Sequence, residues 1–100
     1  MKARFHEAAD AELTEAIQYY DAKTPGLGDR FFAEVKAATR RIEQYPQIAP
    51  VIDHGVRAKT LPSFPYRLIY VVDSDGLWIV AVAHGHRRPG YWADRLPTIH

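Results

Sequence analysis

The 100-residue chain contains no cysteine. This absence excludes disulfide bonds, a thiolate nucleophile and metal sites built from thiolates, and it fits the cytoplasmic location that we expect. Long apolar runs are missing too. No stretch approaches the roughly 20 apolar residues of a membrane-spanning helix, and the N-terminal sequence MKARFHEAADAE is too acidic for a signal peptide. We therefore expect no membrane partner.

A large excess of charge of one sign is also missing, because the net charge at pH 7 is only +1. A protein that binds nucleic acids mainly through its overall charge carries a much larger positive excess. The small excess that exists lies in the C-terminal half. The apolar share of 47% is ordinary for a globular protein. A chain of this length forms a core without disulfides, so we expect a single domain over residues 1–100.

Motifs for metals and cofactors are incomplete. His84 and His86 flank Gly85, but two histidines do not make a full ligand set, and no carboxylate stands beside them at a suitable spacing. The GLG sequence at residues 26–28 lies between two predicted helices and does not follow a strand, so it indicates a turn and not a phosphate-binding loop. We expect no metal and no cofactor.

Two helices are predicted in the N-terminal half. Apolar residues follow helical spacing over Glu7–Lys23, with acidic residues early, where the helix dipole favours anions. Thr24 and Pro25 fit the cap and the first position of a second helix. This second helix is expected to run to about Tyr45 and to end before Pro46. Because the link is so short, the two helices form an antiparallel hairpin.

A β-hairpin is predicted in the C-terminal half. Two apolar runs, Phe64–Val72 and Leu77–Ala83, flank the turn sequence DSDG. The other expected elements are strands at Lys2–His6 and Val56–Leu61, a connection at Gln47–Gly55 and a short helix at Tyr91–Leu96. The order β-α-α-β-β-β predicts an α+β fold, in which the helical hairpin packs on a mainly antiparallel sheet of three or four strands.

The predicted β-hairpin is apolar on both faces. With a turn symmetric about Ser74 and Asp75, one face carries Tyr66, Leu68, Tyr70, Val72, Leu77, Ile79, Ala81 and Ala83, and the other carries Arg67, Ile69, Val71, Trp78, Val80, Val82 and His84. One face packs on the helices. We expect the other face to be covered by the chain itself or by a partner.

Basic, titratable and phenolic side chains gather near the second face. In this register Arg67 lies opposite Val82 and is a diagonal neighbour of His84, whereas a shift of one residue would place Arg67 and His84 on opposite faces. The candidates for chemistry are Arg67, His84, His86, Arg87, Arg88 and Tyr91, with Arg57 and Lys59 on the preceding strand. Such a surface suits contact with RNA or phosphate.

RNA cleavage through the 2′-hydroxyl needs a base, an acid and a clamp for the developing charge. In this hypothesis His84 or His86 is the base. Tyr91 or a histidine is the acid, and Arg67 with Arg87 holds the phosphate. The structural alternative is that Arg67 pairs with an acid or a backbone carbonyl and that His84 caps the strand end.

Three stretches of the chain resemble the ParE/RelE superfamily of type II toxin–antitoxin toxins, and its ParE-like members in particular. They are EAIQYYDAKTPGLGDRFFAEV, RRIEQYPQIAP and FPYRLIYVVDSDGLWIVAVAHGHRRPGYW. The resemblance extends in order over roughly residues 3–92. It implies the same β-α-α-β-β-β fold that the pattern of residues predicts.

The resemblance also implies a partner. Toxins of this superfamily are paired with a cognate antitoxin from an adjacent gene, whose C-terminal segment folds along the sheet and the helical hairpin. Such a segment would cover the second apolar face of the β-hairpin. We therefore expect the partner-binding residues to be Trp78, Val80, Val82, Arg88 and Trp92.

The superfamily contains two kinds of activity. ParE-type toxins inhibit DNA gyrase by binding it, whereas RelE-type toxins cleave mRNA in the ribosome. Arg67 matches the position of a catalytic arginine of the RelE type, and Arg87 and Tyr91 lie in the region that carries further functional residues there. The net charge of +1 disfavours the anionic ribosomal substrate. The PGLG and RRPGYW sequences are closer to ParE-like members.

Three functions are consistent with these observations. The leading one is a ParE-like toxin that binds gyrase, is not an enzyme and is neutralised by an antitoxin. The second is a metal-independent ribonuclease that uses Arg67, His84, Arg87 and Tyr91 on mRNA in the ribosome. The third is an inactive protein with the toxin fold that serves as an antitoxin-binding module or as part of a co-repressor.

Overall fold

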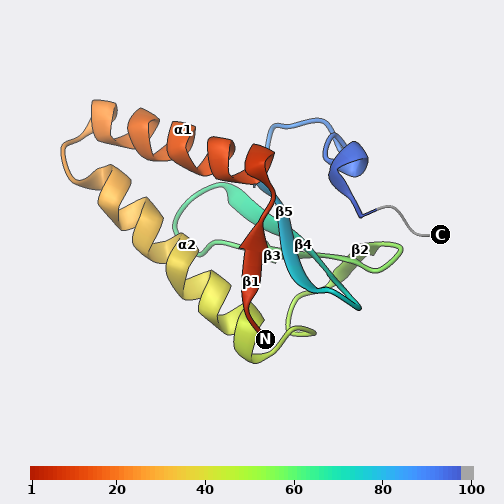
Figure 1. Cartoon of the computed structure of the whole chain (residues 1–100). Helices are drawn as coiled ribbons and strands as arrows, with labels where there is room; N and C mark the ends of the chain where they lie inside the picture. Colours follow the sequence, from red (N-terminus) through yellow and green to blue (C-terminus); the bar gives the residue numbers. More distant parts are fainter. Residues whose placement is uncertain (98–100) are drawn as a thin grey trace.

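The computed structural model describes residues 1–97. It contains strands β1 (Ala3–Phe5), β2 (Val51–Asp53), β3 (Val56–Thr60), β4 (Tyr66–Asp73) and β5 (Gly76–His84), helices α1 (Glu7–Lys23) and α2 (Leu27–Gln44), and a short 3-10 helix η1 (Ala93–Arg95). Figure 1 shows the two long helices joined as a hairpin beside the sheet. The predicted α+β fold and the order of its helices and main strands are confirmed.

The junction between the helices differs from the prediction in one detail. Helix α2 begins at Leu27, and its N-cap is Gly26, which has a φ of +88°. Thr24 is extended and ends α1, where its N–H donates to the carbonyl of Tyr20. The expected capping role of Thr24 in the second helix is therefore wrong. A residue before proline is driven out of the helical conformation, which explains why Thr24 stops α1 before Pro25.

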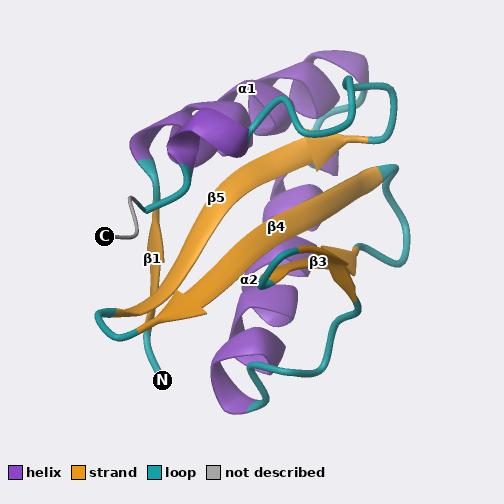
Figure 2. Ribbon diagram, turned by 90° about the vertical axis from the view of Figure 1, so that its right-hand side faces the viewer, coloured by secondary structure: helices purple, strands orange, loops and turns teal. Residues whose placement is uncertain are grey.

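The sheet has five strands in the order β1-β5-β4-β3-β2. β1 is parallel to β5, and the other neighbouring pairs are antiparallel. Figure 2 shows β5 and β4 as the long, twisted centre of the sheet. β2 lies inside the segment expected to be a connection, and it pairs with β3 across a tight turn in which Gly55 has a φ of +69°. The short length of β2 explains why its sequence carries so little periodicity.

The register between β4 and β5 changes along the hairpin. Near the turn Tyr70 pairs with Ile79, as the symmetric turn predicts, but Ile69 pairs with Ala81. Val80 is therefore the extra residue of a β-bulge. A shift of one residue moves every later side chain of the strand to the opposite face.

The bulge corrects the predicted neighbours of Arg67. Arg67 pairs with Ala83, and His84 pairs with Tyr66. Ala83 lies in the core on the face away from the helices, whereas Tyr66 packs against the core beneath them. The prediction that Arg67 and His84 share a face is therefore wrong, and the alternative register, which separates them, is the one that forms.

Two apolar cores lie on opposite faces of the sheet. The larger core joins the helices to one face, and its buried members include Leu13, Phe31, Val35, Ile42, Leu68, Tyr70, Leu77, Ile79 and Val82. The smaller core lies on the other face and contains Val56, Ala58, Ile69, Val71, Val80, Ala81, Ala83 and Trp92. The apolar character of both faces of the hairpin is thereby explained within one chain.

The C-terminal segment after β5, residues 85–97, covers the second face, and we call it the tail. Trp92 is 4% exposed and is part of the smaller core, with Tyr91 and Leu96 packed against it. The short helix predicted in this segment exists as η1, which is brief and of the 3-10 type. This face was expected to be covered either by the chain itself or by a partner, and within the described residues the tail covers it.

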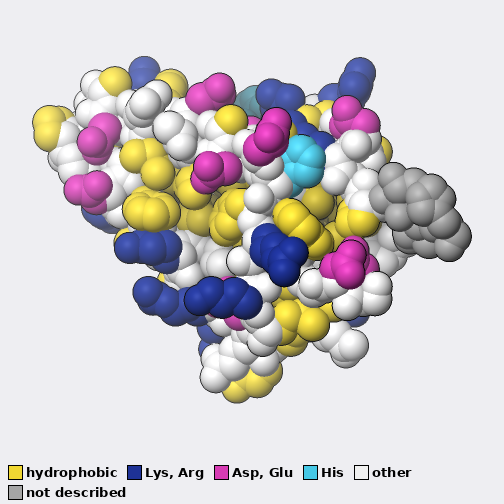
Figure 3. All heavy atoms as spheres, in the orientation of Figure 1, with side chains coloured by type: hydrophobic (Ala, Val, Ile, Leu, Met, Phe, Trp, Pro, Cys, Tyr) yellow, Lys and Arg dark blue, Asp and Glu magenta, His cyan; other side chains and the backbone are white. Residues whose placement is uncertain are grey.

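The outer surface of the helical hairpin carries a groove lined by Phe5, Asp10, Leu13, Phe32, Val35, Lys36, Thr39 and Arg40. Figure 3 shows hydrophobic side chains exposed between acidic side chains over α1 and basic side chains along α2. Phe32 is 37% exposed there. Within residues 1–97, neither helix has the length and the apolar character required to cross a bilayer.

Candidate functional site

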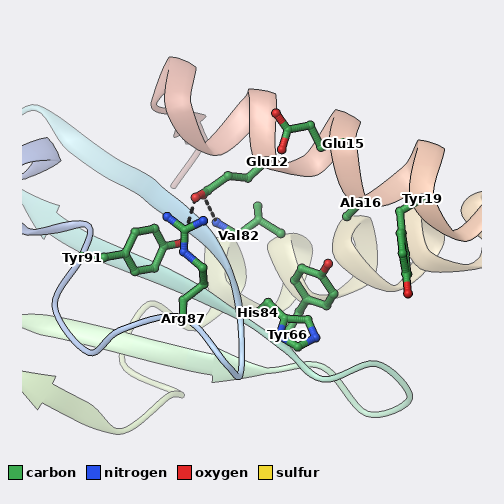
Figure 4. Close-up of a pocket in the computed structure, with 9 residues that line it drawn as sticks. All are labelled: Glu12, Glu15, Ala16, Tyr19, Tyr66, Val82, His84, Arg87 and Tyr91. Carbon is green, nitrogen blue, oxygen red and sulfur yellow. Dashed lines mark hydrogen bonds between the residues drawn. The ribbon is translucent and has the colours of Figure 1, made fainter.

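A hollow of about 330 Å³ lies where α1, the open end of the β4–β5 hairpin and the tail meet. Its lining consists of Glu12, Glu15, Ala16, Tyr19, Tyr66, Val82, His84, Arg87 and Tyr91. Figure 4 shows that α1 supplies one wall and that the strands and the tail supply the other. The lining holds carboxylates, phenols, an imidazole and a guanidinium.

The carboxylate of Glu12 is the central acceptor at this site. It receives four hydrogen bonds: from the Tyr91 hydroxyl at 2.8 Å, from the Val82 N–H at 3.0 Å, and from two Arg95 nitrogens at 2.9 and 3.1 Å. The side chains of Glu12 and Arg95 are only 17% and 15% exposed. Paired donors on one carboxylate favour a fixed geometry. Glu12 therefore joins α1, β5 and the tail.

The backbone of β5 explains why this ion pair is needed. β1 covers one edge of β5 only at the start of the strand, and the last backbone bond runs from the N–H of His6 to the carbonyl of Ile79 at 2.9 Å. Further along the same strand, the Val80 carbonyl accepts from Arg95 at 3.1 Å and the Val82 N–H donates to Glu12. The two side chains thus satisfy backbone groups at the point where the neighbouring strand ends.

Tyr91 is held on two sides. Its hydroxyl donates to Glu12, while the guanidinium carbons of Arg87 and Arg95 lie 4.1 and 5.0 Å from the centroid of its ring. Burial, and then the hydrogen bond to Glu12, raise the pKa of Tyr91 to about 12. The phenol is therefore protonated at neutral pH and acts as a donor. Its ring is placed to attract the guanidinium of Arg87.

His84 lies at the opposite end of the hollow from Tyr91 (Figure 4), with His86 beside it. The rings of Tyr66 and His84 are 5.0 Å apart, and the rings of His84 and His86 are also 5.0 Å apart. The Nδ1 of His84 accepts from the backbone N–H of His86 at 3.0 Å. His84 is thus held at the end of β5 by aromatic contacts and a local turn, which agrees with the structural alternative for this residue.

The four residues expected for RNA cleavage do not form one group. Arg67 projects from the sheet face opposite to that of His84, as the register requires. Arg87 lies over the ring of Tyr91, and the Tyr91 hydroxyl is already donated to Glu12. His84, Arg87 and Tyr91 line the hollow together, and Arg67 does not.

The residues expected to bind a partner also separate into two groups. Val80, Val82 and Trp92 are 1%, 2% and 4% exposed, so they pack inside the protein. Arg88 is exposed on the tail, and Trp78 is half-buried with the guanidinium of Arg4 5.5 Å from its ring. The structure thus differs from the expectation for the first three. Val80 and Trp92 pack together in the smaller core, where Trp92 takes the place that was assigned to a partner, and Val82 packs in the larger core under the helices.

Local sequence patterns do not indicate the role of Glu12 or Arg95. They are 83 positions apart, and each looks like an ordinary surface charge on its own segment. Within residues 1–97, no group of three or more histidine or carboxylate side chains is arranged to hold a metal ion. The site offers a basic surface made by the exposed Arg87 and Arg88, on a tail that Glu12 and Trp92 attach to the rest of the protein.

Comparisons with known proteins agree with this architecture. The model of the family described as "ParE toxin of type II toxin-antitoxin system, parDE" matches residues 3–89. Toxin ParE2 of Mycobacterium tuberculosis is 34% identical over 90 residues, which cover 88% of this chain and 85% of that toxin, in both strain CDC 1551 / Oshkosh and strain H37Rv.

A solved structure shares the fold. A chain of the chromosomal ParDE toxin–antitoxin system from P. aeruginosa superimposes with a TM-score of 0.63 over 84% of this chain and 95% of that chain, at 18% sequence identity. The family match covers most of the chain, and the curated relative has a similar length. The chain therefore belongs to the ParE toxin family of type II toxin–antitoxin systems.

Proposed function

We propose that the protein inhibits DNA gyrase by binding it through the basic tail, and that a cognate antitoxin from an adjacent gene neutralises it. The observation that favours binding over catalysis is the separation of Arg67 from His84 by the bulge at Val80. A ribonuclease of the kind considered above needs these groups on one substrate. Tyr91 supports the same choice, because its hydroxyl is engaged by Glu12 and its pKa is raised to about 12.

The composition of the tail also favours binding to a protein target. His86, Arg87 and Arg88 follow β5 directly and are exposed, and the acidic Glu12 is already neutralised by Arg95. A protein target with an acidic surface would meet two exposed guanidinium groups there. Such complementary charges accelerate association and give specificity.

The antitoxin is proposed to lie in the groove between the helices. With Val80, Val82 and Trp92 buried, that groove supplies exposed apolar surface beside α2, including Phe32. Its rims differ in charge, since Asp10 lies on α1 and Lys36 and Arg40 lie on α2. A segment that folds on binding gains affinity from such a groove.

The test is controlled expression of the toxin without its antitoxin, with plasmid supercoiling and total RNA measured in the same cultures. Altered supercoiling with intact mRNA is the expected result. Early loss of translated mRNA with normal supercoiling would contradict the proposal and indicate the ribonuclease. No growth defect from a soluble, folded protein would contradict it as well, and would indicate the inactive binding module.

Two variants make this test specific to the tail. Arg87→Ala together with Arg88→Ala removes the exposed charges and should abolish the change in supercoiling. Lys36→Ala with Arg40→Ala removes two exposed charges from α2 and should leave supercoiling activity intact while weakening the complex with antitoxin. If both double variants behave alike, the assignment of the two surfaces is wrong.

A further inference from the structure

We infer that Glu12 is the positioning residue of the tail, and that it sets the place of Arg87 by holding Tyr91. The consequence of this inference is that gyrase binding through Arg87 depends on a residue of α1, and this consequence rests on the proposed function. The role that it assigns to Glu12 concerns geometry and does not require Glu12 to touch the target.

The tail has little else to fix its outer part. Its backbone bonds are mostly local, such as Arg87 N–H to His84 at 3.0 Å and Tyr91 N–H to Arg88 at 3.2 Å. Such turns shape a segment but do not attach it to the body. The bond from the Gly85 N–H to the carbonyl of Pro65, at 2.8 Å, attaches only its first residue.

Glu12 supplies the missing attachment. One carboxylate oxygen accepts from the Tyr91 hydroxyl, and Arg95, which follows in the same tail, pairs with both oxygens. Trp92, between these two residues, is buried against the sheet. The part of the tail from Tyr91 to Arg95 is thus fixed to α1 and to the sheet face together.

The position of Arg87 follows from that of Tyr91. The Arg87 guanidinium carbon lies 4.1 Å from the Tyr91 ring centroid, a distance at which a cation is attracted to an aromatic face. Figure 4 shows the Arg87 guanidinium next to the Tyr91 ring, while the Tyr91 hydroxyl bonds directly to the Glu12 carboxylate. Without the hydroxyl bond the ring is held only by its packing on the smaller core and by Arg95, so its orientation under the Arg87 guanidinium is less well fixed. Glu12 acts on Arg87 through one intermediate residue.

The distribution of charge around Glu12 also supports a positioning role for this residue. The Glu12 carboxylate is matched by the Arg95 guanidinium, so it does not cancel the charge of Arg87. Glu15 lines the same hollow one turn along α1. It shares the helix face and the chemistry of Glu12, yet Glu12 alone carries the bonds to the tail described above. Glu15 is therefore a matched control.

The experiment measures the position of Arg87 and the binding of gyrase separately. In the NMR spectrum of the full chain, the δ-protons of Arg87 should be shifted upfield by the Tyr91 ring. Glu12→Gln loses the negative charge and one of the two acceptor oxygens, so it should reduce this shift, and Glu15→Gln should preserve it. Tyr91→Phe keeps the Glu12–Arg95 pair and loses only the hydroxyl bond, so it carries the test if Glu12→Gln fails to fold.

Binding to purified DNA gyrase then tests the consequence. Glu12→Gln and Arg87→Ala should each weaken binding by about tenfold, a readily measured change in Kd. The double variant should bind no more weakly than Arg87→Ala alone, because both changes act on one contact. In combination with Arg88→Ala, by contrast, the effect of Glu12→Gln should add in full, a pattern that a general loss of stability would not produce.

The outcomes separate the inference from the proposed function. An unchanged Arg87 shift in both Glu12→Gln and Tyr91→Phe overturns the positioning role, whatever the target is. Additive losses for Glu12→Gln and Arg87→Ala also overturn it. If the unmodified toxin does not bind gyrase, the proposed function fails, and the loss of the Arg87 shift alone then decides whether Glu12 positions the tail.

Discussion

Gly28 of α2 lies against the carbonyl oxygen of Ile17 in α1. A Cβ atom at residue 28 would be 2.5 Å from that oxygen and 2.8 Å from the Oδ1 of Asp21, which accepts the Gly28 N–H at 2.8 Å. The close approach of the two helices near their junction therefore depends on the absence of a side chain at this position.

Gly28→Ala should destabilise the protein, because the added methyl group must push backbone apart. We expect the free energy of unfolding to fall by about 1–3 kcal/mol, the usual range for overpacking. Urea denaturation would measure it. Gly85→Ala is the matched control, since a Cβ there would meet the Pro65 carbonyl at an ordinary 3.5 Å. Equal stability of the two variants would contradict the account of the helix junction.

Trp92→Ala should remove the cover of the second sheet face. Trp92 is 4% exposed, so its truncation should lower the free energy of unfolding by about 3–5 kcal/mol. Trp78→Ala, at a half-buried position on β5, should cost clearly less. Thermal melting would compare the two. The account fails if Trp92→Ala is the milder change, because that would mean that the tail does not hold the smaller core closed.

The raised pKa of Tyr91 predicts that the folded protein loses stability at high pH. Its pKa is about 12 in the folded protein and near 10 when unfolded, so above pH 10 the unfolded chain releases a proton that the folded chain retains. The contribution of the protonated Tyr91 to the free energy of unfolding is complete below pH 10 and is lost as the pH rises towards 12. After allowance for solvent screening we expect about 1–2 kcal/mol.

Tyr91→Phe isolates this effect. Burial also raises the pKa values of Tyr20, Tyr66 and Tyr70, so the unmodified protein combines several contributions. The difference in unfolding free energy between the protein and Tyr91→Phe should shrink from about pH 9 to about pH 11.5, as the linkage relation requires. A difference that stays constant over this range would show that Tyr91 titrates normally.

Tyr70→Phe should weaken the attachment of the segment that follows α2. Tyr70 is fully buried, and its hydroxyl donates to the carbonyl of Pro46 at 2.8 Å. We expect a loss of about 0.5–1.5 kcal/mol, the typical net value of one hydrogen bond. Faster amide hydrogen exchange in residues 46–50 should accompany it. Unchanged exchange there would place the effect elsewhere in the core.

The sequence predicted the elements whose signals are local. The bounds of α1 and the turn between β4 and β5 agree with the structure, because helical spacing and turn residues act over short distances. The short strand β2 escaped prediction, since three residues carry almost no periodicity. Elements are therefore predictable when their sequence pattern extends over enough residues to show a period.

The bulge at Val80 and the pairing of Glu12 with Arg95 could not be predicted from local patterns. A bulge adds one residue to a strand without changing its composition, so the alternation of apolar side chains remains plausible on both faces. Glu12 and Arg95 meet only because β1 ends early and leaves backbone groups of β5 to be satisfied. The candidate site therefore depended on tertiary structure, while its basic residues were visible in the sequence.

The pairing of β1 with β5 has a consequence for the order of folding during synthesis. β1 is synthesised before its partner residues Leu77–Ile79, which follow both long helices and strands β2, β3 and β4 in the chain. A nascent chain therefore carries α1 and α2 without the central strand on which they pack. Contacts between distant parts of a chain slow folding. The sheet face on which the helices pack consequently forms only after β5 has been synthesised.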